Sequence, residues 1–96
     1  MEKRTEETVE KTAEKLTDMP NIGPKLAAHL TQAGVETPEQ LRQMGAEEAF
    51  LRIRAKADAT ACLHELEALA GAVEGVRKSL LPPERKAELK AWFRGL

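Results

Sequence analysis

The 96-residue sequence has one cysteine, no tyrosine and only three aromatic residues. A single cysteine cannot form an internal disulfide. Because proteins without disulfides are typical of a reducing compartment, we expect a cytoplasmic protein. Three aromatic side chains are too few for nucleic-acid binding by base stacking, which needs exposed rings. No apolar run approaches the roughly 18 residues of a membrane-spanning helix, so we expect no membrane partner. What remains is one small globular domain with a modest hydrophobic core.

The net charge of −1 argues against a strongly basic nucleic-acid-binding protein, but the charges are unevenly distributed. Residues 1–18 carry six acidic and four basic residues, whereas residues 76–96 carry six basic and two acidic residues. Lys86, Lys90 and Arg94 follow one another at helical spacing and form one basic stripe. This stripe could meet a phosphate backbone or an acidic protein surface. The alternative is an ordinary solvated helix face.

The most informative stretch is residues 19–30, which read MPNIGPKLAAHL. Asn21 and Gly23 are the residue types that most readily adopt a positive φ, so both are expected in a tight turn. Pro24 suits the first position of a helix, and the helical pattern continues from there to Ala33. A polar helix is expected before the turn, over about residues 7–16. The stretch therefore predicts an α-hairpin, in which a tight turn joins two helices.

This hairpin resembles the helix-hairpin-helix motif of DNA-binding proteins. The residues that match are Leu16, Met19, Ile22, Gly23, Pro24, Lys25 and Ala27. The motif usually has glycine where this chain has Asn21. The resemblance implies non-specific binding of double-stranded DNA, with backbone N–H groups at a helix N-terminus donating to phosphate oxygens. The residues concerned would be Asn21, Ile22, Gly23, Lys25 and Leu26. The alternative is a purely structural hairpin, with Ile22 as a plug and Gly23 as a hinge.

Further helices are expected after the hairpin. A short helix is capped by Thr37, with Gln40 completing a capping box, and is closed by Gly45. The next helix, over about residues 46–56, buries Phe50 on its inner face. A final helix begins at Pro83 and ends near Arg94. Its buried side is expected to comprise Leu89, Trp92, Phe93 and Leu96.

The longest helix is expected over about residues 59–78, with Asp58 as its N-cap. Large apolar residues cover one of its faces and small residues the other, which predicts a central helix packed on both sides. Gly71 and Gly75 inside this helix would each cost roughly 1 kcal/mol relative to alanine. Close approach of another helix would explain them, and a kink near Gly71 is the alternative.

No catalytic, cofactor-binding or metal-binding site is expected from the sequence. His29 and His64 are the only histidines, and neither has a metal-binding spacing with Cys62. Cys62 lies among leucines in the predicted long helix, so we expect a buried, inert thiol. No phosphate-binding loop, catalytic triad or dinucleotide fingerprint is present. A non-enzymatic function is therefore predicted.

Four segments together resemble the C-terminal domain of the TfoX (Sxy) family of bacterial competence regulators. In order they read DMPNIGPKLAAHL, AGVETPEQLRQMGAEEAFLRIR, CLHELEALAGAVEGVR and LPPERKAELKAWF. The resemblance implies an all-α domain of about five helices over residues 16–96. This domain would have a SAM-domain-like, helix-hairpin-helix core, a long central helix and a C-terminal helix. Residues 1–15 would be a polar extension, expected to be disordered or a frayed helix. The resemblance also implies a link to the regulation of competence genes.

Two functions are then open. The first is a regulatory module that binds double-stranded DNA through the hairpin, with the stripe of Lys86, Lys90 and Arg94 as a second basic surface. The second is a protein-interaction module that assists a transcription regulator or forms a homo-oligomer. It would use the small-residue face of the long helix, or the C-terminal helix. If Lys25 and the basic stripe share one surface, DNA binding is favoured, and if they lie on opposite sides it is disfavoured.

Overall fold

The computed structural model describes residues 14–96, and this part of the chain is all-α, as the sequence predicts. Its elements are the 3-10 turn η1 (Leu16–Asp18), α2 (Pro24–Gln32), α3 (Pro38–Met44), α4 (Ala46–Lys56), α5 (Leu63–Glu74), the 3-10 turn η2 (Lys78–Leu80) and α6 (Pro83–Arg94). The extension predicted over residues 1–15 lies almost wholly outside the described residues, as does most of the helix predicted over residues 7–16. Among residues 14–96, no helix combines the length and the apolar character needed to cross a bilayer.

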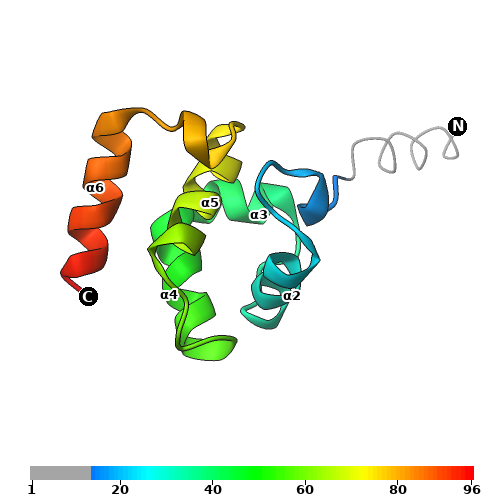
Figure 1. The fold of residues 1–96 in the computed structure, drawn as a ribbon. Coiled ribbons are helices and arrows are strands. Elements are labelled where there is room, and N and C mark those ends of the chain that lie inside the picture. Colours follow the sequence, from blue (N-terminus) through cyan, green and yellow to red (C-terminus); the bar gives the residue numbers. More distant parts are fainter. Residues whose placement is uncertain (1–13) are drawn as a thin grey trace, which may run out of the picture.

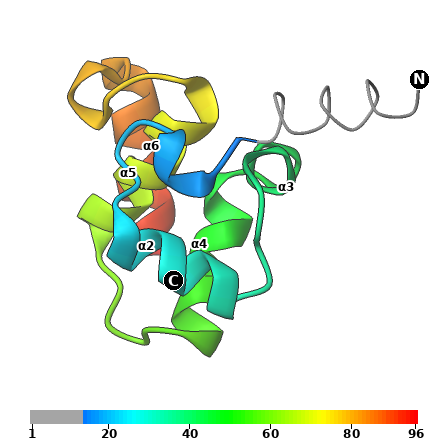
Figure 2. The same cartoon turned by 90° about the vertical axis from the view of Figure 1, so that its right-hand side faces the viewer.

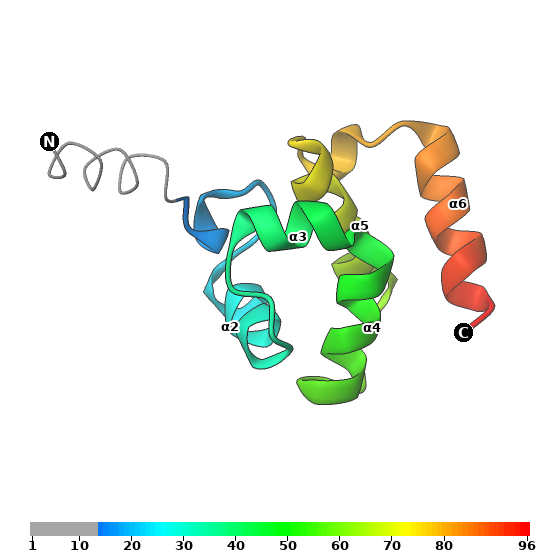
Figure 3. The same ribbon diagram turned by 180° about the vertical axis from the view of Figure 1, so that it is seen from behind.

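Helices α4 and α5 occupy the middle of the molecule, with α2 on one side and α6 on the other (Figure 1). The view from behind gives the same order (Figure 3), and the view turned by 90° shows α2 in front and α6 behind (Figure 2). The largest fully buried side chains are Phe50, Leu30, Leu41, Ile53, Leu66, Leu69, Leu89 and Val35. Burying each side chain of this size contributes about 1.5–3 kcal/mol. The core therefore draws on α2 to α6 together.

Local sequence signals set the short helix α3 as predicted. The Thr37 hydroxyl accepts a hydrogen bond of 3.1 Å from the Gln40 backbone N–H, as expected of an N-cap. The Gln40 side chain completes the cap by accepting from the Glu36 N–H at 2.7 Å, instead of from Thr37. Gly45 ends α3 with a φ of 89°, a conformation that favours glycine. The chain can therefore turn at once into α4, whose bounds agree with the prediction.

Helix α5 is shorter than the sequence predicts, and Asp58 is not its N-cap. The Asp58 carboxylate accepts from the Thr60 N–H at 2.9 Å and from the Thr60 hydroxyl at 2.6 Å. This local turn holds residues 59–61 out of the helix, because the carboxylate is bonded within the loop. At the other end, Gly75 adopts the left-handed conformation with a φ of 77° and ends the helix four residues after Gly71. Helix α5 is nonetheless central, since it contacts α3, α4 and α6.

Aromatic side chains attach α6 to the rest of the fold. The Phe50 ring is fully buried and lies 6.1 Å from the Trp92 ring and 5.9 Å from the Phe93 ring, edge to face in both cases. Leu89 is also fully buried, whereas Trp92 and Phe93 remain partly exposed. The prediction that Leu96 is buried is wrong. The helix ends at Arg94, and the Leu96 side chain is 51% exposed.

Candidate functional site

The hairpin turn is stabilised by Asn21, not by Gly23. Asn21 has a φ of 71°, which confirms the predicted left-handed residue. The same prediction for Gly23 is wrong, because Gly23 is extended with a φ of −92° and serves as the N-cap of α2. A Cβ built on Gly23 would meet nothing within 4 Å. Position 23 therefore does not require glycine for the fold.

The Asn21 side chain points into the protein and joins the hairpin to the end of α5. Its amide nitrogen donates to the carbonyl oxygens of Ala68, at 3.3 Å, and Val76, at 3.0 Å. Its amide oxygen accepts from the Lys78 N–H at 3.0 Å. Position 71 lies directly beneath, because a Cβ on Gly71 would stand 2.5 Å from the Asn21 amide nitrogen. The close approach that the glycine predicted is real, but it comes from the Asn21 side chain and the backbone of Val76 and Lys78, and not from a packed α-helix.

The predicted backbone donors of the hairpin are only partly free. Ile22 is buried, and its N–H already donates to the Met19 carbonyl oxygen at 3.3 Å. Gly23 and Lys25 are exposed, whereas the Leu26 side chain is buried. The N–H groups of Lys25 and Leu26 belong to the first turn of α2, where helix geometry provides no intrahelical acceptor. Two to three N–H groups thus remain for an anion, near the Lys25 ammonium.

Carboxylates border this helix N-terminus. The Thr60 hydroxyl and N–H lower the pKa of Asp58, and the nearby Lys25 and His29 side chains add to this effect. Lys25 is therefore close enough to Asp58 to feel its charge. Glu65, at the start of α5, contacts His29 with an Oε2–Nδ1 distance of 3.5 Å. The negative charge of Asp58 acts on Lys25, which weakens the attraction of the site for phosphate.

The basic stripe lies on the opposite side of the molecule from the hairpin. Lys90 and Arg94 are exposed on α6 and Lys86 is partly exposed. Within residues 14–96, none of the three takes part in an ion pair. Figures 1 and 3 show α4 and α5 standing between α2 and α6. Helix α2, which carries Lys25, and helix α6, which carries the basic stripe, are therefore separated by α4 and α5.

The neighbouring base Arg85, which the sequence analysis does not single out, has a structural role. Its guanidinium donates to both carboxylate oxygens of Glu47, at 2.9 and 3.2 Å, and to Glu88 at 3.1 Å. Its Nε also lies 3.4 Å from a carboxylate oxygen of Glu74. The hydrogen bonds from Arg85 hold the pKa of Glu47 below its ordinary value of 4.5. Arg85 therefore attaches α6 to both α4 and α5.

Comparison with known proteins identifies the family. The family model described as the TfoX C-terminal domain matches residues 12–93. The chain belongs to the TfoX C-terminal domain family. The protein Sxy of Escherichia coli K12 is 33% identical over 87 residues, which are 91% of this chain and 41% of Sxy. This TfoX C-terminal domain thus spans about two-fifths of the length of that relative.

Two solved structures share the fold of this TfoX C-terminal domain. An uncharacterized protein from Listeria monocytogenes, in a triclinic crystal form, is 43% identical with a TM-score of 0.83, covering 85% of this chain and 92% of its own. A Listeria monocytogenes protein of unknown function, in a tetragonal form, is 44% identical with a TM-score of 0.80, covering 83% and 96%. The helical arrangement is therefore that of experimentally determined proteins.

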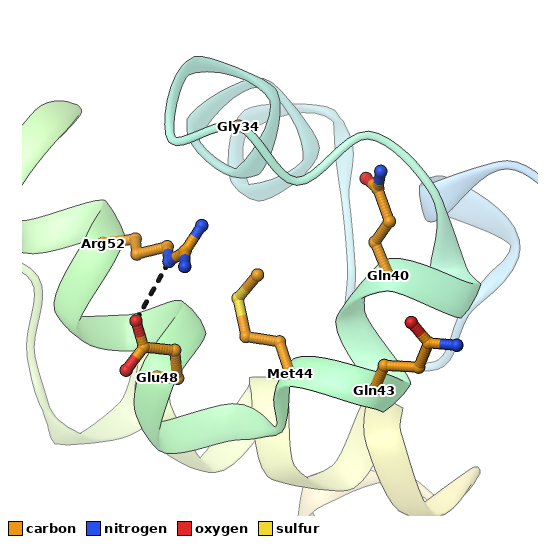
Figure 4. A pocket seen from close by; sticks show the side chains of 6 residues that line it. All are labelled: Gly34, Gln40, Gln43, Met44, Glu48 and Arg52. Atoms are coloured by element: carbon orange, nitrogen blue, oxygen red, sulfur yellow. Dashed lines mark hydrogen bonds and ion pairs between the residues drawn. The ribbon is translucent and has the colours of Figure 1, made fainter.

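An open hollow of about 430 Å³ lies between the end of α2 and the α3–α4 corner. Its lining residues are Gly34, Gln40, Gln43, Met44, Glu48 and Arg52 (Figure 4). Arg52 and Glu48 pair across one turn of α4 at 3.0 Å, and the Met44 thioether projects into the hollow. None of the residues predicted to bind DNA lines it. With its one ion pair satisfied internally, the hollow offers no free charged group to a ligand.

Two further features of this TfoX C-terminal domain differ from the sequence analysis. Cys62 is exposed, not buried, because it precedes α5 as its N-cap instead of lying inside a longer helix. His29, Asp58 and Glu65 form a cluster whose candidate ligand atoms all lie within 4.8 Å of one another. These three residues come from separate elements, so no sequence spacing could have revealed the cluster.

Proposed function

We propose that this TfoX C-terminal domain is a non-enzymatic, cytoplasmic regulatory module of bacterial competence that binds an acidic surface of a protein partner through α6. The exposed face of α6 carries this proposal. Lys90 and Arg94 are exposed and Lys86 is partly exposed, on the same helix as the partly exposed rings of Trp92 and Phe93. Positive charge next to apolar surface is a suitable combination for an acidic partner, because charge steers the encounter and the rings supply contact area.

The other surface considered for protein binding is already occupied within the fold. Ala68, Gly71 and Ala72, on the small-residue face of α5, are buried. Asn21 lies directly over Gly71, and the turn that follows α5 covers the same region. A partner could reach this face only after the hairpin had detached. Of the two surfaces considered, only α6 is therefore accessible to a protein partner in the folded domain.

Binding of double-stranded DNA through the hairpin is the second candidate function. Gly23, Pro24 and Lys25 are exposed at the N-terminus of α2, which favours phosphate contact. Against it stand the inward-pointing Asn21 side chain and the nearby carboxylate of Asp58. A contact of this kind would be weak and strongly salt-dependent, because one hairpin reaches few phosphates.

A hybrid protein tests the proposal. This chain replaces the matching region of Escherichia coli Sxy, and a reporter gene behind a competence-gene promoter measures regulation. The double variant Lys86→Glu/Lys90→Glu reverses the charge of the α6 face, and we expect it to abolish regulation by the hybrid. Lys25→Glu makes the same type of change on the opposite side and serves as the matched control, so we expect it to leave regulation intact.

The converse pattern would contradict the proposal. Regulation that survives the α6 charge reversal but is lost with Lys25→Glu would support the hairpin and DNA instead. Circular dichroism of each isolated variant domain shows whether its helices are retained. Lys90 is exposed and Lys86 partly exposed, and neither takes part in an ion pair within residues 14–96, so we expect the double variant to fold.

A further inference from the structure

The corner where α2 meets the loop between α4 and α5 brings an imidazole and two carboxylates together. His29 comes from α2, Asp58 from the loop after α4, and Glu65 from the first turn of α5. One candidate ligand atom from each residue lies within 4.8 Å of the other two. The His29 and Glu65 side chains are only 15% and 18% exposed. Three donors from three separate segments thus converge on one partly enclosed point.

We propose that His29, Asp58 and Glu65 form a binding site for a divalent transition-metal ion, and that zinc is the ion whose chemistry fits best. One imidazole nitrogen and two carboxylate oxygens are ligand types that zinc accepts, with water in the fourth position. Imidazole disfavours magnesium and calcium, which prefer oxygen ligands alone. The inference goes beyond the proposed function, because neither α6 nor a protein partner is needed for it.

The distances leave room for the ion after small side-chain movements. Ligand atoms in a tetrahedral zinc site lie about 2.0–2.2 Å from the metal, and therefore about 3.4 Å from one another. The His29 Nδ1 and Glu65 Oε2 atoms are already 3.5 Å apart. At 3.5 Å their contact is a weak hydrogen bond, so little is lost when a metal replaces it.

The charges at this corner also favour a cation. Asp58 and Glu65 supply two negative charges, whereas Lys25 supplies one positive charge on an exposed, flexible side chain. Asp58 uses its Oδ1 atom to bind Thr60, and its other oxygen is the one left for a metal. Bound zinc would join α2 to the start of α5 and so stabilise the hairpin side of the fold.

Metal titration of the full chain tests the site. The protein is stripped with a chelator, desalted and titrated at neutral pH with Zn²⁺ and, separately, with Co²⁺. Tetrahedral Co²⁺ has an intense visible absorption that reports its ligand geometry. We expect one metal ion per chain, tetrahedral Co²⁺ bands, and a melting temperature that rises by several degrees with excess Zn²⁺, because the ion binds only the folded state.

Matched variants locate the ion. Glu65→Gln and Asp58→Asn keep the shape of each side chain, and asparagine can still accept from Thr60. Each variant should weaken metal binding about tenfold or more, since even residues outside the coordination shell have effects of that size. Glu67→Gln is the control on the same helix, because Glu67 lies 4.0 Å from the other histidine, His64, outside the cluster. Cys62→Ser is the control for the exposed thiol, and we expect neither control to change the affinity.

Three results would overturn the site. They are the absence of stoichiometric metal binding, equal affinities in Glu65→Gln and Glu67→Gln, and loss of binding in Cys62→Ser. Melting temperatures of the metal-free variants separate loss of a ligand from loss of the fold. A Glu65→Gln protein with an unchanged metal-free melting temperature and no Zn²⁺-induced rise would establish that the carboxylate binds the ion.

Discussion

The Asn21 side chain lies directly on Gly71, so closely that any side chain at position 71 would collide with it. A Cβ there would stand 2.5 Å from the Asn21 amide nitrogen and 2.7 Å from the Val76 carbonyl oxygen. The second of these neighbours is backbone, which cannot move aside cheaply. The contact joins the hairpin turn to the C-terminal end of α5, 50 residues further along the chain.

Gly71→Ala should therefore destabilise the domain, although alanine favours helices in general. We expect a loss of about 1–3 kcal/mol, the usual cost of forcing atoms into a packed site. Gly23→Ser is the matched control at an open position. It should stabilise the domain by about 0.5–1 kcal/mol, because serine caps α2 and restricts the unfolded chain. Urea unfolding followed by circular dichroism measures both. Equal effects of the two substitutions would show that position 71 is not crowded.

Asn21 itself should tolerate few replacements. Asn21→Ala removes the partners of three backbone groups and places alanine at a φ of 71°. We expect a loss of about 4 kcal/mol or more, since each unpaired, partly buried group costs about 1–3 kcal/mol and the left-handed conformation costs about 1–2 kcal/mol. Asn21→Gly loses the same hydrogen bonds without the backbone strain, so it should be roughly 1 kcal/mol more stable than Asn21→Ala. If the two variants had equal stability, the strain at this turn would be negligible.

The contact between Glu47 and Arg85 should make the stability of the domain sensitive to acid. Arg85 lowers the pKa of Glu47 in the folded protein below 4.5, so the contact stabilises the fold above the unfolded-state pKa. This stabilisation is lost as the pH falls through the lowered pKa. At neutral pH we expect Glu47→Gln to cost about 1 kcal/mol, near the upper end for ion pairs that reach solvent.

Melting temperatures measured from neutral pH down to about pH 3 check this dependence on the Glu47 carboxyl group. The curves of the native protein and Glu47→Gln should approach each other as the pH falls and Glu47 becomes protonated. Glu48→Gln is the control, since Glu48 pairs with Arg52 at 3.0 Å on an exposed part of α4. A constant difference between the Glu47→Gln and native curves at every pH would exclude the charge as the cause.

Cys62 should react in the folded protein. It is exposed at the N-cap of α5, so a thiol reagent such as Ellman's reagent should modify one thiol per chain without denaturant. The modification should leave the helical circular dichroism signal unchanged, because the side chain supports no core contact. A thiol that reacts only after urea is added would show that α5 begins earlier, and that Cys62 is buried as the sequence alone suggested.

Features that depend on residues a few positions apart could be predicted from the sequence. Features that depend on tertiary packing could not. The start of α3 follows from the hydrogen bond between Thr37 and Gln40, three residues apart, so it was predictable. Asp58 fits equally well as an N-cap or as the acceptor in a turn, and packing decides between them. That one choice sets the start of α5 and with it the exposure of Cys62.

The candidate binding surfaces also depend on contacts between residues that are far apart in the sequence. The partners of Asn21 are 47 to 57 residues away, and nothing near position 21 reveals whether its side chain points inward or toward a ligand. His29 and Glu65 are 36 residues apart. Relations between elements also decide whether Lys25 and the α6 bases share a surface. Such relations come from the fold as a whole, and no local pattern encodes them.

We infer that the hairpin stabilises the fold and that α6 carries the partner-binding surface. Fluorescence anisotropy of a labelled random-sequence duplex, titrated with this protein at about 50 mM salt and again at about 200 mM, tests it most directly. We predict no saturable binding in the micromolar range at either salt concentration. Micromolar binding at low salt that collapses at high salt, and that Lys25→Ala weakens equally for every sequence, would contradict the claim and restore the hairpin as a DNA-binding site.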